Sequence, residues 1–92
     1  PAVRWFTPPE QIAVLVEEAT KQAFRAKLYH FGEKSRQMSF ALQRIEAPVF
    51  DWTLKCDGSA DLLGEGVPSA QVEIELPAGI LCVLQAQTKD GG

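Results

Sequence analysis

The strongest constraint in this sequence is a two-residue alternation of apolar and polar side chains that starts at Phe24 and recurs almost to the end of the chain. Alternation with this period is typical of a β-strand that has one buried face. Turn-forming residues such as Asp57-Gly58-Ser59 and Pro77-Ala78-Gly79 separate the segments, and connections this short join antiparallel neighbours. The pattern predicts five strands, at residues 24–31, 38–43, 50–56, 72–76 and 80–87.

The residues before Phe24 favour a helix instead. Thr7-Pro8-Pro9-Glu10 combines a capping residue, a proline suited to the first turn and an acid three positions after the cap. Apolar residues then recur at three- and four-residue spacing, which predicts an amphipathic helix of about 14 residues. The segment 60–69 is open between a short helical turn and a loop. We therefore expect an α+β fold, mainly β, with an N-terminal helix packed on a five- or six-stranded antiparallel small split β-barrel.

The chain is short enough to be one domain, since domains usually contain about 100–200 residues. No repeat, low-complexity segment or linker interrupts the 92 residues. We expect a folded core at 5–87 and a flexible tail at 88–92. Because the chain starts at Pro1 and ends in Gly91-Gly92, we also expect residues 1–92 to be a single domain excised from a larger protein.

The two cysteines, Cys56 and Cys82, each fall in an apolar alternation. A secreted mini-domain held by disulfides normally has four or more cysteines, so both are interpreted as reduced and packed in the core. Two cysteines and the single histidine are too few for a zinc site. The sequence shows neither a signal peptide nor an apolar run long enough to span a membrane. These features predict a cytoplasmic protein.

Composition and motifs argue against an enzyme and against a nucleic-acid binder. The chain is 46% apolar with a net charge of −3, which lacks the basic excess that phosphate binding requires. The lone His30 has no adjacent nucleophile and is expected at the surface or at a strand edge. Two carboxylate pairs, Glu73/Glu75 and Asp57/Asp61, are expected on solvated surfaces, and Gly64-Glu65-Gly66 does not match a phosphate-binding loop. We predict no catalytic residue, no metal ligand and no cofactor-binding residue in this chain.

The charge distribution is the more informative feature. Residues 1–46 contain seven Lys/Arg and five Asp/Glu (+2), whereas residues 47–92 contain two and seven (−5). Four basic residues cluster on or near the first predicted hairpin, and we take them as the docking residues for a protein partner: Arg25, Lys27, Lys34 and Arg36. The alternative to a docking surface is an ordinary solvated face. A second function of a different class is a small β-barrel that binds an apolar small molecule between Phe40, Trp52 and the helix.

The order of elements resembles the N-terminal domain of YcgR-type flagellar brake proteins. The resemblance covers most of the chain and is carried by the capped segment 7–15, by 26–29 with the Gly32 turn, by 40–45, and by the closing hairpin 72–83. It implies a non-catalytic regulatory and protein-interaction module of a bacterial cyclic di-GMP signalling protein that controls flagellar motility. It also implies that a C-terminal PilZ domain follows, that flagellar motor proteins are partners, and that the protein works in the cytoplasm at the flagellar basal body.

The nucleotide-binding motif of PilZ domains is absent from this chain. That motif is an Arg-x-x-x-Arg run followed by Asp/Asn-x-Ser-x-x-Gly, whereas Arg36 and Arg44 lie too far apart here and Leu62 stands where the glycine is needed. No ligand residue can therefore be assigned by the resemblance. We expect cyclic di-GMP to bind the following domain, and this chain to hold no cofactor of its own.

Overall fold

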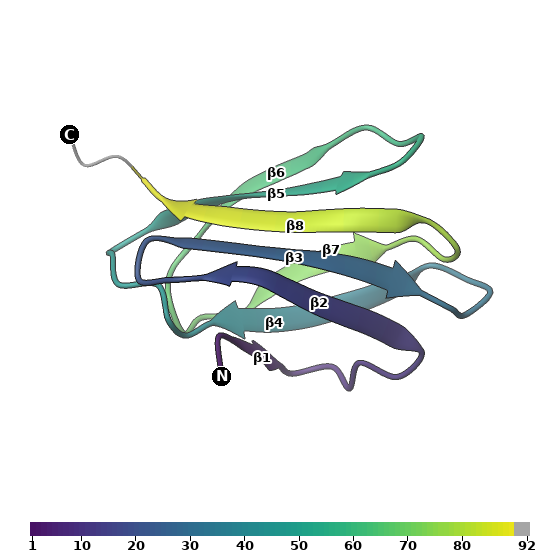
Figure 1. The fold of residues 1–92 in the computed structure, drawn as a ribbon, viewed down its shortest axis with the longest axis horizontal. Coiled ribbons are helices and arrows are strands. Elements are labelled where there is room, and N and C mark those ends of the chain that lie inside the picture. Colours follow the sequence, from purple (N-terminus) through teal and green to yellow (C-terminus); the bar gives the residue numbers. More distant parts are fainter. Residues whose placement is uncertain (90–92) are drawn as a thin grey trace.

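The computed structural model describes residues 1–89, and all of its regular secondary structure is β. The strands form two antiparallel sheets, a three-stranded sheet of order β1-β4-β7 and a five-stranded sheet of order β2-β3-β8-β5-β6 (Figure 1). The strands are β1 (Val3–Trp5), β2 (Ile12–Ala19), β3 (Ala23–His30), β4 (Arg36–Leu42), β5 (Phe50–Cys56), β6 (Leu62–Gly66), β7 (Val72–Leu76) and β8 (Leu81–Thr88).

The two sheets pack face to face as a sandwich, so the expected split barrel is wrong. Three strand pairs are nested along the chain, as in one long folded hairpin: β3 with β8, β4 with β7, and β5 with β6. The middle pair lies in the opposite sheet from the other two. This nested pairing is that of a jelly roll. The alternating strands bury one face, as expected. Because β4 and β7 belong to a separate sheet, each sheet in the described residues keeps two open edges and no barrel closes. The edge strands are β2 and β6 in one sheet, and β1 and β7 in the other.

The expected N-terminal helix is wrong, and residues 12–19 form strand β2. Ile12, Val14 and Val16 recur every two residues, and their branched side chains fit a pleated strand. They pair with His30, Leu28 and Ala26 of β3. Residues 1–89 contain no helix, and β2 is an edge strand of the five-stranded sheet.

Local geometry also prevents the helix from starting. Gln11 has a φ of 61°, a left-handed conformation that an α-helix does not accept. The predicted capping residue Thr7 does not cap a helix either, because its hydroxyl accepts a hydrogen bond from the Ser39 N–H of β4 at 3.0 Å. The Thr7-Pro8-Pro9-Glu10 segment thus connects β1 in one sheet to β2 in the other.

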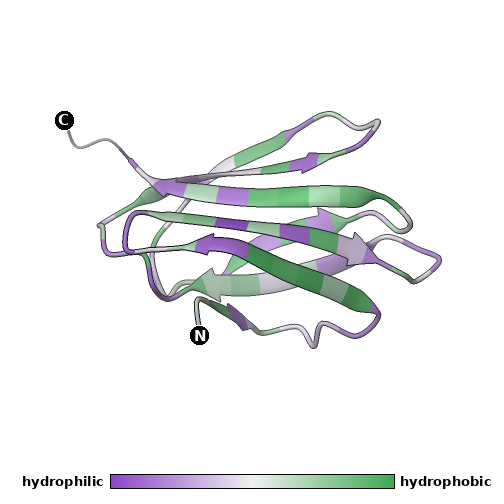
Figure 2. Cartoon of the chain, in the orientation of Figure 1, coloured by the Kyte–Doolittle hydropathy of each residue, from purple (hydrophilic) through white to green (hydrophobic). Residues whose placement is uncertain are grey.

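The core lies between the two sheets and is built by the alternation that the sequence predicted. Along β3, Phe24, Ala26, Leu28 and His30 are buried while the residues between them are half-exposed. Hydrophobic and hydrophilic residues alternate visibly along this strand in Figure 2. Five expected strands are present as β3, β4, β5, β7 and β8, and the undecided segment 60–69 contains β6.

The C-terminal strand extends to Thr88, which pairs with Phe50. The Lys89 N–H then donates to the Val49 carbonyl at 3.4 Å. The other residues of the expected tail, 90–92, lie outside the described residues. None of the residues that the structure describes forms a helix with the length and apolarity needed to cross a membrane.

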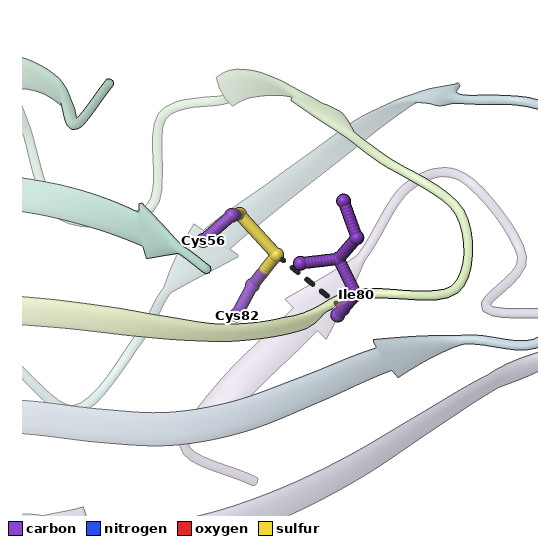
Figure 3. Close-up of a disulfide and its surroundings, with 3 residues drawn as sticks. All are labelled: Cys56, Ile80 and Cys82. Atoms are coloured by element: carbon purple, nitrogen blue, oxygen red, sulfur yellow. Dashed lines mark hydrogen bonds between the residues drawn. A yellow bond between two sulfur atoms is a disulfide. The ribbon is translucent and has the colours of Figure 1, made fainter. Parts of the chain in front are cut away.

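Cys56 and Cys82 form a disulfide, so the interpretation of two reduced cysteines is wrong (Figure 3). Both side chains face the core, as the alternation predicted, and the register of β5 and β8 places the two residues directly opposite each other with their Cα atoms 4.1 Å apart. Cys82 Sγ also lies 3.7 Å from the Ile80 carbonyl oxygen, a contact rather than a hydrogen bond because a disulfide sulfur has no proton. The bridge thus joins two central strands of the five-stranded sheet.

Candidate functional site

The four basic residues predicted to dock a partner lie at two separate places. Arg25 and Lys27 are on the outer face of the five-stranded sheet, in β3. Lys34 lies in the loop between β3 and β4, and Arg36 is the first residue of β4. The structure therefore divides the predicted docking residues into a sheet pair and a hairpin pair.

Both cations of the sheet pair contact one carboxylate. Glu17, at the bulge in β2, lies 3.1 Å from Arg25 Nε and 3.4 Å from Lys27 Nζ. Arg25 also donates from Nη1 to the Gln85 side chain at 3.0 Å. Partial burial acts to raise the pKa of Glu17, but the hydrogen bonds and charges of Arg25 and Lys27 outweigh it and hold that pKa below its ordinary value. These two cations are already engaged within the sheet.

The hairpin pair has no such partner. Within residues 1–89, no carboxylate lies within 4.0 Å of the Lys34 or Arg36 side-chain nitrogens. Arg36 instead donates to two backbone carbonyls of the β1–β2 connection, from Nη1 to Glu10 at 2.6 Å and from Nη2 to Pro8 at 2.7 Å. These bonds hold the guanidinium in place and leave its charge without a counter-ion.

A pocket of about 500 Å³ opens beside these two cations. It lies where the β1–β2 connection meets the β3–β4 hairpin, at one end of the sandwich (Figure 1). Its lining residues come from these two segments and from the end of β3: Gln11, His30, Phe31, Gly32, Glu33, Lys34, Ser35 and Arg36. Of the charged residues in this lining, two are cations and one is a carboxylate.

Three costly features meet at this pocket. His30 is only 3% exposed, and its Nδ1 is buried with no hydrogen-bond partner in the described part of the chain. Gln11 holds its positive φ here, and the chain passes His30 so closely at Gly32 that a Cβ there would lie 2.5 Å from Nε2. Unpaired buried polar atoms and left-handed non-glycine residues each reduce stability, and both concentrate at functional sites. We therefore take this pocket as the candidate site and call it the His30 pocket.

The prediction that His30 lies at the surface or at a strand edge is wrong. The residue is in phase with Phe24, Ala26 and Leu28, so the same alternation that placed those three in the core also places His30 there. That phase was the signal that sequence reasoning did not use. For Gln11 and Gly32 no comparable signal exists, because their importance depends on two loops that meet only in the folded chain.

The two carboxylate pairs lie on exposed surfaces, as expected. Glu73 and Glu75 are on the outer face of the three-stranded sheet, where their carboxylates accept hydrogen bonds from Gln37 and Ser35. Asp57 and Asp61 lie in the β5–β6 turn, and Asp61 reaches Lys55 at 4.0 Å. Neither pair is held in a dry cleft of the kind that perturbs a carboxyl for acid–base work.

The residues proposed to hold an apolar ligand do not form a joint site. Phe40 is fully buried in the three-stranded sheet and packs against Trp5, with ring centroids 5.6 Å apart. Trp52 is in the other sheet, where its ring lies over Gly64 so closely that a Cβ there would come within 2.5 Å of it. The helix that was expected to complete this site is a strand.

No family model matches the chain, and no curated protein matches it either. In the part of the chain that the structure describes, no group of three or more His, Cys, Asp or Glu residues is arranged to hold a metal ion. The case for function therefore depends on the geometry of the site.

Proposed function

We propose that this domain is a non-catalytic interaction module that binds an acidic segment of a protein partner through Lys34 and Arg36. The observation that carries the proposal is the difference between the two cation pairs. Glu17 forms salt bridges with both Arg25 and Lys27, whereas Lys34 and Arg36 have no carboxylate within 4.0 Å among residues 1–89. Attraction between a positive patch and an acidic partner speeds and orients association.

The position of Arg36 supports the same proposal. Its hydrogen bonds to the Pro8 and Glu10 carbonyls hold the guanidinium before any partner arrives, which reduces the entropy lost on binding. A guanidinium carries five N–H donors, so donors remain for a carboxylate after these two bonds. Lys34 is exposed at the hairpin and adds a second, mobile charge.

The test uses a fluorescently labelled hexaglutamate peptide with blocked termini, titrated with the 92-residue chain at low salt. Lys34→Glu should weaken binding by about 1 kcal/mol, or about fivefold in Kd, since it converts an attraction into a repulsion. Lys21→Glu is the matched control because it changes the net charge equally at an exposed turn joining β2 and β3. Equal loss of binding in the two variants, or no binding by the unaltered chain, would overturn the proposal.

A more specific placement is also proposed, on the resemblance alone: the regulatory part of a cyclic di-GMP signalling protein, ahead of a PilZ domain that docks on the flagellar motor. The segments of the resemblance that lie in β3, β4, β7 and β8 support it, whereas the capped helix that was part of it is absent from residues 1–89. The natural reading frame beyond Gly92 tests this placement. A PilZ motif there supports it, and a frame without one overturns it.

The cytoplasmic location stays a prediction. It was inferred partly from reduced cysteines, and the Cys56–Cys82 disulfide removes that support, because such bonds persist mainly in oxidising compartments. Fractionation of the natural host with an antibody to this domain would test it.

A further inference from the structure

We infer that the His30 pocket binds a carboxylate group, with His30 Nε2–H as a donor and Lys34 and Arg36 as the charges that neutralise it. This inference rests on the proposed function, since it names the place where an acidic side chain of the partner would be held. The pocket is an open hollow with a volume of about 500 Å³, enough for a side-chain carboxylate.

The neutral His30 ring carries its proton on Nε2. A neutral imidazole carries one N–H, and its position must be inferred from the surroundings. Nδ1 is buried with no partner, and an orphaned buried N–H is the rarer and more costly arrangement. The proton therefore belongs on Nε2, the ring nitrogen that lies against Gly32 on the pocket side.

His30 Nε2 lies where the β3–β4 hairpin passes close to the ring at Gly32. With any side chain at position 32, the Cβ would lie 2.5 Å from Nε2 and 3.2 Å from the Gln11 side-chain oxygen. Glycine lets the hairpin pass this close to the ring, and Nε2, unlike Nδ1, is not among the fully buried atoms without a partner. The imidazole edge and the Gln11 amide both reach this point, and an amide can turn either its oxygen or its NH₂ group toward a ligand.

The lining of the pocket favours a negatively charged ligand. The pocket offers Nε2–H, the Lys34 ammonium and the remaining Arg36 donors, against a single acid, Glu33. Donors in excess of acceptors favour a group that only accepts hydrogen bonds, and two cations against one carboxylate favour an anion. A carboxylate satisfies both conditions.

A purely structural role explains these features less well. A structural buried histidine normally has hydrogen-bond partners for its ring nitrogens, and a phenylalanine would fill the same apolar position without an unpaired nitrogen. Strain at Gln11 and the narrow passage at Gly32 occur beside the same ring. A ligand at Nε2 would give the ring a hydrogen-bond partner at the place where these features meet.

The test is an NMR titration of the 92-residue chain with sodium acetate, compared with sodium chloride at equal ionic strength. We expect saturable shifts of the His30 ring and of the Gly32 and Lys34 amides, with a Kd of about 1–30 mM, as suits a ligand this small. Inorganic phosphate forms a second arm, and it should bind less well than acetate if the pocket selects a planar carboxylate. Identical shifts in acetate and chloride, or tighter binding of phosphate, would overturn the inference.

Variants separate binding from stability. His30→Phe keeps an aromatic ring at the site and should lower acetate affinity at least about tenfold, the size of one hydrogen bond to a charged group. Tyr29→Phe is the control, since the neighbouring side chain is on the opposite face of β3 and should leave the Kd unchanged. If His30→Phe does not fold, Lys34→Met carries the test at an exposed position with an expected loss of about fivefold. Unchanged acetate binding in the folded variant refutes the inference.

Two tripeptides identify the source of the carboxylate and keep the two proposals distinguishable. A blocked Gly-Glu-Gly peptide presents a side-chain carboxylate, and an N-acetylated triglycine presents a terminal one. Preference for the first supports an internal acidic segment, as the proposed function requires. Acetate binding at His30 without hexaglutamate binding would overturn the docking function alone, and hexaglutamate binding without acetate shifts at His30 would overturn the pocket alone.

Discussion

Reducing the Cys56–Cys82 disulfide should lower the free energy of unfolding by about 3.5 kcal/mol. The bond closes a loop with a sequence separation of 26 residues. In the chain-entropy model, cross-linking removes entropy from the unfolded chain that grows with the logarithm of loop length, and this separation gives about 3.5 kcal/mol at 25 °C. A chain of this size is expected to have a total stability of about 5–14 kcal/mol, so the bond contributes a large fraction.

We do not expect the native state to reduce the stabilisation that the disulfide contributes. The two cysteines are directly opposite in the β5–β8 register, with six further residue pairs before them in the ladder, and both side chains are buried. Reduction truncates neither side chain, so it leaves no cavity of the kind that a large-to-small substitution creates. The measured loss should therefore come mainly from the unfolded chain.

The assay is urea unfolding followed by tryptophan fluorescence, with and without a phosphine reductant. With a slope of about 1.5 kcal/mol per molar urea, the midpoint should fall by about 2 M. Mass spectrometry after alkylation of the unreduced chain checks that the bond is present, and the double variant Cys56→Ala/Cys82→Ala should not respond to the reductant. Coincident midpoints for bonded and reduced chains would refute the loop-entropy reasoning, and full alkylation without reductant would refute the bond itself.

Two further changes have defined expectations. Gly66→Ala should destabilise the chain by about 1–3 kcal/mol, because the new Cβ would lie 2.5 Å from the fully buried Phe50 ring, and the urea midpoint measures this. Glu17→Gln should lower stability at pH 7 but not in acid: the folded-state pKa of Glu17 is lowered from 4.5, so its contribution is present above that value and disappears as the pH falls through the folded-state pKa. Melting curves of both proteins across this range should converge at low pH, and a constant difference would show that Arg25 and Lys27 do not act through the carboxylate charge.

Much of the candidate site could not be predicted from the sequence. The sequence grouped four basic residues that the structure divides into two pairs, and the pairing of Arg25 and Lys27 with Glu17 depends on which strand lies beside β3. The alternation contained enough information to bury His30, but not to show that its Nδ1 would lack a partner. The pocket itself forms from segments separated by the whole length of β2 and β3, so no local pattern describes it.

The sequence by itself determined where most strands lie and which of their faces is buried, because a period of two is a local property that each segment carries independently. Only the tertiary structure decided that residues 12–19 join a sheet, that the strands divide into two sheets, and that Cys56 meets Cys82. Residues 12–19 satisfy the spacing of a helix and of a strand, so the exposed edge of β3, with which they pair, resolves the choice. Strand pairing joins residues far apart in the chain, and its register depends on how whole faces fit together.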